Sequence, residues 1–75
     1  MEEFIKNFAN QFDETDPSEI NASTTFHELD EWSSLVGLAI LNMVAKKYGV
    51  KLSPAELKSS VTVTDVYNLV QSKLV

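Results

Sequence analysis

Phenylalanines at helical spacing dominate the apolar pattern at the start of the chain. The apolar face consists of Phe4, Phe8 and Phe12, flanked by Ile5 and Ala9. The residues between them are mostly polar, so one face is suited to a core and the other to solvent. This spacing predicts an amphipathic helix over residues 2–13.

A long polar stretch separates this helix from the next apolar segment. Asp16-Pro17 interrupts the helical pattern, because a residue that precedes proline is disfavoured in the helical conformation. The stretch up to Ser33 is rich in serine, threonine, aspartate and glutamate and has no helical period. Phe26 and Leu29 are apolar exceptions, and we expect them to pin this first loop to the core.

The strongest helical pattern covers residues 35–48, which are apolar on nearly every side. Ser33 and Ser34 precede this run and are typical helix-capping residues, and Gly49 follows it as a typical C-terminal residue. A helix that is apolar all round lies at the centre of a domain or reserves a second face for partners. Gly37 lowers the helical propensity, and close approach of a neighbour or ligand would explain it.

Two shorter helices are predicted after this one. Ser53-Pro54 followed by Glu56 has capping-box spacing and indicates a short helix over residues 54–59. We expect Thr64 to cap a last helix with the apolar set Val66, Tyr67, Leu69, Val70 and Leu74. The pattern predicts an all-α four-helix bundle with three main helices, one short third helix and a long first loop.

Length and composition restrict the fold further. The 75 residues suit a single domain over residues 1–75, and the 44% hydrophobic content is typical of a globular chain. The absence of cysteine excludes disulfides, thiolate metal ligands and cysteine nucleophiles. The acidic Met1-Glu2-Glu3 start does not resemble a secretory signal, and no apolar run approaches the ~20 residues of a membrane span. We therefore expect a cytoplasmic monomer.

Charge is distributed unevenly along the chain. Residues 1–35 contain nine acidic residues and one basic residue, whereas residues 36–75 contain two acidic and five basic residues. There is no arginine, and the formal net charge is −5. An acidic chain repels phosphate backbones, so nucleic acid is not an expected partner. A basic partner protein is favoured instead.

Catalytic and metal-binding patterns are missing. A single histidine, His27, cannot form a zinc site without cysteine, and no G-x-S-x-G nucleophile elbow is present. The two glycines do not form a phosphate-binding loop. We expect neither an enzyme nor a metal site.

The start of the long helix carries the remaining candidate chemistry. Trp32, Ser33 and Ser34 place a large aromatic ring and two hydroxyls where unpaired amides and the helix dipole favour anions. A serine at this position can be esterified without burying the new charge. On spacing alone, the alternative remains that both serines are caps and Trp32 belongs to the core.

Several segments together resemble the acyl carrier protein family. They are Phe26-x-x-Leu29, Trp32-Ser33-Ser34-Leu35, Tyr48, Gly49-Val50-Lys51-Leu52, Leu52-Ser53-Pro54 and Thr62-Val63-x-Asp65. The resemblance as a whole extends over residues 4–74. The run Ser33-Ser34-Leu35 is similar to the D-S-L tripeptide that opens the second helix of that family. The spacing to Tyr48 and to the segment before the last helix selects Ser34 over Ser33.

The resemblance implies that Ser34 carries a 4'-phosphopantetheine arm from coenzyme A. A phosphopantetheinyl transferase would attach the arm, and acyl-transferring or acyl-activating biosynthetic enzymes would load and use it. The chain would carry acyl thioesters for fatty acid, polyketide-like or related biosynthesis. Candidates for the core or an acyl cavity are Leu38, Leu41, Val44, Tyr48, Leu52, Val63 and Tyr67.

Three departures from the family pattern affect the expected partners. Ser33 replaces the aspartate, the long helix lacks the usual acidic face, and Ser60 stands where an aliphatic residue is usual, with Val61 expected to take over its packing. The residues suggest an apolar partner patch with an acidic edge. Its candidates are Asp30, Glu31, Trp32, Ser33, Leu35, Val36, Ala39, Ile40 and Met43.

Two alternatives stay open on the sequence. An aminoacyl or peptidyl carrier of a nonribosomal pathway would share the fold and the arm. A helical interaction module that carries no arm would share the fold alone.

Overall fold

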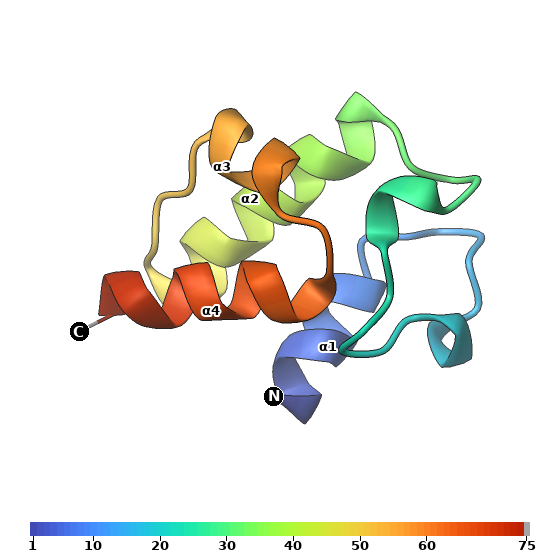
Figure 1. The fold of residues 1–75 in the computed structure, drawn as a ribbon, viewed down its shortest axis with the longest axis horizontal. Helices are drawn as coiled ribbons and strands as arrows, with labels where there is room; N and C mark the ends of the chain where they lie inside the picture. Colours follow the sequence, from blue (N-terminus) through green and yellow to red (C-terminus); the bar gives the residue numbers. More distant parts are fainter. Residues whose placement is uncertain (75) are drawn as a thin grey trace.

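A computed structural model describes residues 1–74 of the chain. Its helices are α1 (Glu2–Ala9), α2 (Ser34–Tyr48), α3 (Pro54–Ser59) and α4 (Val63–Leu74) (Figure 1). The first loop contains two 3₁₀ turns, Pro17–Glu19 and Phe26–Glu28, and residues 1–74 contain no strand. The all-α four-helix architecture with a short third helix and a long first loop is therefore confirmed.

Helix α1 is shorter than the apolar spacing predicts. It ends at Ala9 and not near residue 13, because the chain turns more tightly after Asn10. The amides of Gln11 and Phe12 donate to the carbonyls of Phe8 and Ala9, three residues back, at 3.1 and 3.0 Å. This 3₁₀-type turn still directs Phe12 into the core, where it is buried, so the apolar spacing survives the change of helix type.

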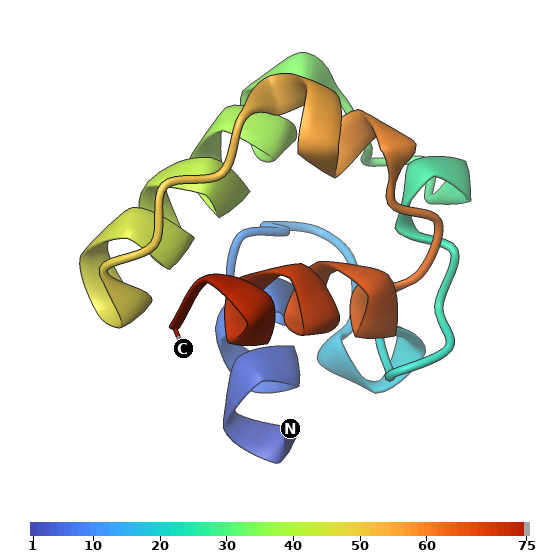
Figure 2. The same ribbon diagram turned by 60° about the vertical axis from the view of Figure 1, so that its left-hand side comes forward.

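The helices surround a core that α1 supplies with phenylalanine. α1 packs against α2 and α4, and α2 also packs against α3 and α4. Figures 1 and 2 show α3 beside α2. In both views α4 lies below this pair. Phe26 is fully buried and Leu29 packs against the same core, which confirms that they pin the first loop.

Local sequence signals set most helix ends. Ser33 is the N-cap of α2. Gly49 follows the last residue of α2 and has the left-handed conformation, with φ 65°. Ser53 and Glu56 form the reciprocal capping box expected at α3. At α4 the cap is Thr62 and not Thr64, because the Asp65 amide donates to Thr62 Oγ1 at 3.2 Å.

Thr64 has a different role, since it joins the first loop to the last helix. Its hydroxyl donates to the Ala22 carbonyl at 2.7 Å, and its amide donates to the same carbonyl at 3.0 Å. The Val63 amide donates to the Thr24 carbonyl at 3.2 Å. A residue predicted to cap its own helix therefore makes a contact 42 positions away in the sequence.

Ser60 corrects another expectation. Its side chain is buried, and its hydroxyl donates to the Glu56 carbonyl at 3.0 Å. Val61 does not take over the packing, because it is 56% exposed. This hydrogen bond to the backbone of α3 satisfies the hydroxyl, so the core accepts serine at this position. Within residues 1–74, no helix has the length and apolar character needed to cross a bilayer.

Candidate functional site

The two adjacent serines at the start of α2 have different roles. Ser33 is the N-cap, and its Oγ accepts a hydrogen bond from the Val36 amide at 3.4 Å. Ser34 is the first helical residue, and its side chain is exposed. Within residues 1–74, the Ser34 hydroxyl has no hydrogen-bond partner in the structure, so the helix cap does not engage it.

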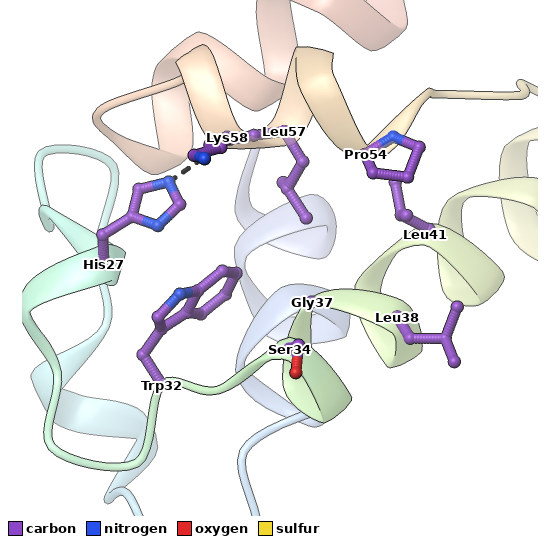
Figure 3. Close-up of a pocket in the computed structure, with 9 residues that line it drawn as sticks. All are labelled: His27, Trp32, Ser34, Gly37, Leu38, Leu41, Pro54, Leu57 and Lys58. Atoms are coloured by element: carbon purple, nitrogen blue, oxygen red, sulfur yellow. Dashed lines mark hydrogen bonds between the residues drawn. The ribbon is translucent and has the colours of Figure 1, made fainter.

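Ser34 lies at the edge of an open groove of about 500 Å³ between α2 and α3. The groove is mostly apolar, and no aspartate or glutamate lines it. Its other lining residues are His27, Trp32, Gly37, Leu38, Leu41, Pro54, Leu57 and Lys58 (Figure 3). An anionic group esterified to Ser34 would therefore meet no carboxylate in the groove and would lie at the positive end of the α2 dipole.

Trp32 separates this groove from the core. Its ring lies edge-on to Phe26, with centroids 5.1 Å apart, and also contacts Phe12. A Cβ atom on Gly37 would lie 3.4 Å from Trp32 Cη2 and 3.6 Å from Leu57 Cδ2. The close approach expected at Gly37 is thus that of Trp32 and α3, and the bare glycine keeps the bottom of the groove open.

His27 forms one end of the groove and has a defined tautomer. Its ring lies edge-on to Trp32, with centroids 4.6 Å apart, and its Nε2 is 3.2 Å from the Leu57 carbonyl oxygen. A carbonyl can only accept, so Nε2 carries the proton of the neutral ring. Nδ1 is then the acceptor of that ring. Figure 3 shows His27 and Lys58 together at this end, with Leu38 at the other.

The apolar partner patch predicted on the long helix is partly wrong. Ile40 and Met43 are buried in the core and not on the surface. Val36 and Ala39 are half-buried, whereas Leu35 is 78% exposed. The helix is apolar on nearly every side, so its sequence alone does not show which side faces the core.

The predicted core and cavity residues divide into three groups. Leu38 is 55% exposed and is not a core residue, and together with Leu41 it lines the groove. Val44, Leu52 and Val63 are buried in the core. Tyr48 and Tyr67 are half-buried and pack against it. Sequence reasoning missed Pro54, Leu57 and Lys58 as groove residues, because their position over α2 depends on how α3 packs.

Glu31 holds the first loop in place, a role that the sequence did not indicate. Its carboxylate accepts hydrogen bonds from the amides of Asp13, Glu14 and Thr15 at 2.6, 3.0 and 2.7 Å, and from the Thr15 hydroxyl at 2.7 Å. The Thr15 hydroxyl, together with these amides, lowers the pKa of Glu31 below its ordinary 4.5 despite some desolvation. Asp30, its neighbour, is exposed on the same acidic side of the molecule.

We expect Glu31→Gln to lower the melting temperature at pH 7, because the charged acceptor of four hydrogen bonds is lost. The folded state lowers the pKa of Glu31, so this carboxylate stabilises the fold fully above pH 4.5 and loses that effect as the pH falls through the lower folded pKa. Thermal unfolding from pH 7 to pH 2 should therefore show a difference between variant and wild type that shrinks in acid. Glu28→Gln is the control, since Glu28 is exposed and its side chain has no hydrogen bond within residues 1–74. Equal curves for both variants would contradict this role.

The groove and the free hydroxyl agree with a comparison against known families. A family model described as "Phosphopantetheine attachment site" matches residues 3–70. No curated protein gives a significant match to the chain. Proteins of this family carry 4'-phosphopantetheine attached covalently, and the exposed Ser34 hydroxyl beside a groove free of carboxylates fits such a group. The chain belongs to the phosphopantetheine attachment-site family and is a carrier protein whose cofactor is covalent 4'-phosphopantetheine.

Proposed function

We propose that the Ser34 hydroxyl is the attachment point of the phosphopantetheine arm and that residues 1–75 act as one acyl carrier domain. The observation that supports this choice is the contrast between the two serines. Ser33 Oγ accepts from the Val36 amide, whereas Ser34 Oγ is exposed and makes no hydrogen bond within residues 1–74. An attaching enzyme can therefore reach Ser34 without breaking the helix cap.

The attachment is a phosphoryl-group transfer to an alcohol. The Ser34 oxygen forms a bond to the phosphorus that bears pantetheine in coenzyme A, and its proton passes to a base of the transferase. The bond from that phosphorus to the nucleotide part breaks, and adenosine 3',5'-bisphosphate leaves. The product is a phosphodiester anion in the first turn of α2, where unpaired amides and the helix dipole favour negative charge. Trp32 lies between His27 and Ser34 in Figure 3, so His27 does not act as a base for Ser34.

The cargo is an acyl group held as a thioester on the arm, for fatty acid, polyketide-like or related biosynthesis. The mostly apolar lining of the groove beside Ser34 supports this class over a charged aminoacyl group. The partners are a phosphopantetheinyl transferase and enzymes that transfer or activate acyl groups. Leu35, 78% exposed beside Ser34, is the apolar side chain that such partners would meet first.

Loading in vitro tests the attachment. The purified chain is incubated with coenzyme A, Mg²⁺ and a broad-specificity phosphopantetheinyl transferase, and its intact mass is measured. We expect a gain of one arm, located at Ser34 by fragmentation of the modified peptide. A gain located at Ser33, or no gain under conditions that modify a known carrier protein, would refute the proposal.

The cargo class is tested on protein purified from its native cells. Ejection of the arm in the mass spectrometer releases it with the group it carries, so the mass identifies that group. An acyl group supports the proposal. An amino acid or peptide would show that the chain is a carrier of a nonribosomal pathway, and protein without any arm would show an unmodified helical module.

A further inference from the structure

The C-terminal half of α2 has an open surface of its own, apart from the groove beside Ser34. A cavity of about 350 Å³ lies there, between α2 and the turn that follows α1. We call it the lysine cavity, and its lining residues are Gln11, Ala39, Asn42, Met43, Lys46 and Lys47. It shares no lining residue with the groove beside Ser34, so α2 offers two separate surfaces to other molecules.

The lysine cavity has an apolar floor and a polar rim. Met43 is buried and Ala39 is half-buried, and these two side chains form the floor. Lys46 and Lys47 are exposed at the rim. Gln11 closes the side toward α1, where its amide nitrogen donates to the Asn7 carbonyl at 3.0 Å. A ligand that fits has an anionic end for the lysines and a short apolar stem for the floor.

Positive charge at this cavity is not balanced by the protein itself. No aspartate or glutamate lines the cavity, and the one salt bridge within residues 1–74 joins Lys73 to Glu56, at 3.1 Å. The C-terminal end of a helix carries about half a negative elementary charge, which the two lysines exceed about fourfold. Lys46 and Lys47 therefore leave an excess of positive charge after they have complemented the dipole of α2.

We propose that the lysine cavity docks an acidic side chain on the surface of a partner enzyme. A glutamate fits best, because its carboxylate can pair with Lys46 and Lys47 while its methylene groups lie on Met43. Carrier domains interact with transferases and biosynthetic enzymes, so the occupant is an enzyme of this kind. The inference does not depend on which serine carries the arm, since the cavity and the groove share no residue.

Docking at the lysine cavity fixes the direction in which a partner lies along α2. Lys46 follows Ser34 by twelve residues, which corresponds to about 18 Å along the helix axis. Asp30 is exposed just before the other end of α2. A partner with its acidic residue at Lys46 and basic residues at Asp30 cannot bind in the reverse direction, because like charges would then meet. Such a partner carries its acidic residue about 18 Å from the point where the arm enters it.

A titration of the ¹⁵N-labelled full chain tests the chemistry of the cavity. The probe is a blocked peptide of four glutamates, and the control is the same peptide with four glutamines. The glutamate peptide should shift the backbone amides of Asn42, Met43 and Lys46 and the side-chain amide of Gln11, whereas Val66 in α4 should stay in place. The chain is measured without the arm and with it, so failure of attachment at Ser34 is recognised separately. Absence of these shifts, or equal shifts with the glutamine peptide, would overturn the proposal.

Matched double variants separate docking from general charge attraction. Lys46→Gln with Lys47→Gln should weaken binding of the glutamate peptide by about threefold or more. Lys6→Gln with Lys51→Gln is the control, because it removes the same charge at two exposed lysines that do not line the cavity. This control should bind like the wild type. Equal weakening in both double variants would contradict a defined site.

Two other anionic occupants are distinguished by separate probes. Inorganic phosphate that produces the same shifts at lower concentration than the peptide would show a small-anion site. Sedimentation with phosphatidylglycerol vesicles, abolished by Lys46→Gln with Lys47→Gln, would show a lipid-binding face. Either result would overturn docking of a protein surface.

Cross-linking by carbodiimide in extract of the native cells identifies the partner. This reagent joins a carboxylate to a lysine that is paired with it, and sequencing of the linked peptides names both residues. A link from Lys46 or Lys47 to an aspartate or glutamate of an enzyme that transfers or activates acyl groups supports the proposal. Links to such enzymes through Lys6 or Lys51 alone, or no link at all, would overturn it.

Discussion

Ser34→Ala is expected to abolish attachment of the arm completely, whereas Ser33→Ala leaves attachment intact. Alanine at position 34 removes the hydroxyl oxygen that we propose as the attachment point, so no phosphoester can form at that position. Ser33 Oγ accepts a hydrogen bond from the Val36 amide as a helix cap, so we expect it to stay unmodified. Intact-mass measurement after incubation with coenzyme A and a transferase shows the difference directly.

Stability measurements on the same two variants provide the control. Ser34→Ala should change the free energy of unfolding by less than about 0.5 kcal/mol, because its side chain is exposed and has no hydrogen bond within residues 1–74. Ser33→Ala should cost about 0.5–1 kcal/mol, since it removes an N-cap whose hydrogen bond is long at 3.4 Å. Loss of modification in Ser33→Ala, with modification retained in Ser34→Ala, would reverse the assignment of the two serines.

Phe8→Ala is expected to have the largest effect on folding. Phe8 is fully buried, and its ring contacts those of Phe4, Phe12 and Phe26. Truncation of a buried phenylalanine costs about 3–5 kcal/mol, which includes both the lost transfer energy and the cavity left behind. A domain of this size has a total stability near the lower end of about 5–15 kcal/mol. The variant would therefore lose most of the free energy of unfolding.

Urea unfolding followed by circular dichroism measures this loss as a lower midpoint with a similar slope. Leu35→Ala is the control, because Leu35 is also a large apolar residue but is 78% exposed. Its cost should stay within about 0.5 kcal/mol. If both variants unfolded at the same urea concentration, the buried ring of Phe8 would not contribute to the free energy of unfolding as its burial indicates.

Contacts between aromatic rings link the core to the groove beside Ser34. Phe26, which anchors the first loop, contacts Trp32, and Trp32 lines that groove. Glu31 fixes the earlier part of that loop through the backbone of residues 13–15. The acidic residues of this loop line a cavity that shares no lining residue with the apolar groove.

Distribution of charge around the groove bears on the choice of partner. α2 contains no acidic residue, and Lys46 and Lys47 occupy its last turn. Lys58 lines the groove itself, whereas Glu14, Glu19, Glu28, Asp30 and Glu31 line a separate cavity at the first loop. A partner that approaches Ser34 over α2 would meet leucines and lysines, so a strongly basic partner surface would be favoured only on the loop side.

The sequence by itself determined the local features of this protein. The spacing of Phe4, Phe8 and Phe12 indicated a buried face, and Ser33, Gly49 and the Ser53–Glu56 box marked helix ends within one or two residues. These signals are local, because helical periodicity and capping depend on residues close in the chain. For the same reason the sequence already placed Ser34 in the first turn of a helix.

Only the tertiary structure decided which way the long helix faces and what stands opposite it. A helix that is apolar on nearly every side has no polar stripe to fix its orientation, so Ile40 and Met43 turn inward and Leu35 and Leu38 outward because of the neighbours that pack on α2. Packing of α3 on α2 brings Leu57 close to Gly37 and creates the groove that Ser34 also lines. Such contacts join residues far apart in sequence, and no local pattern encodes them.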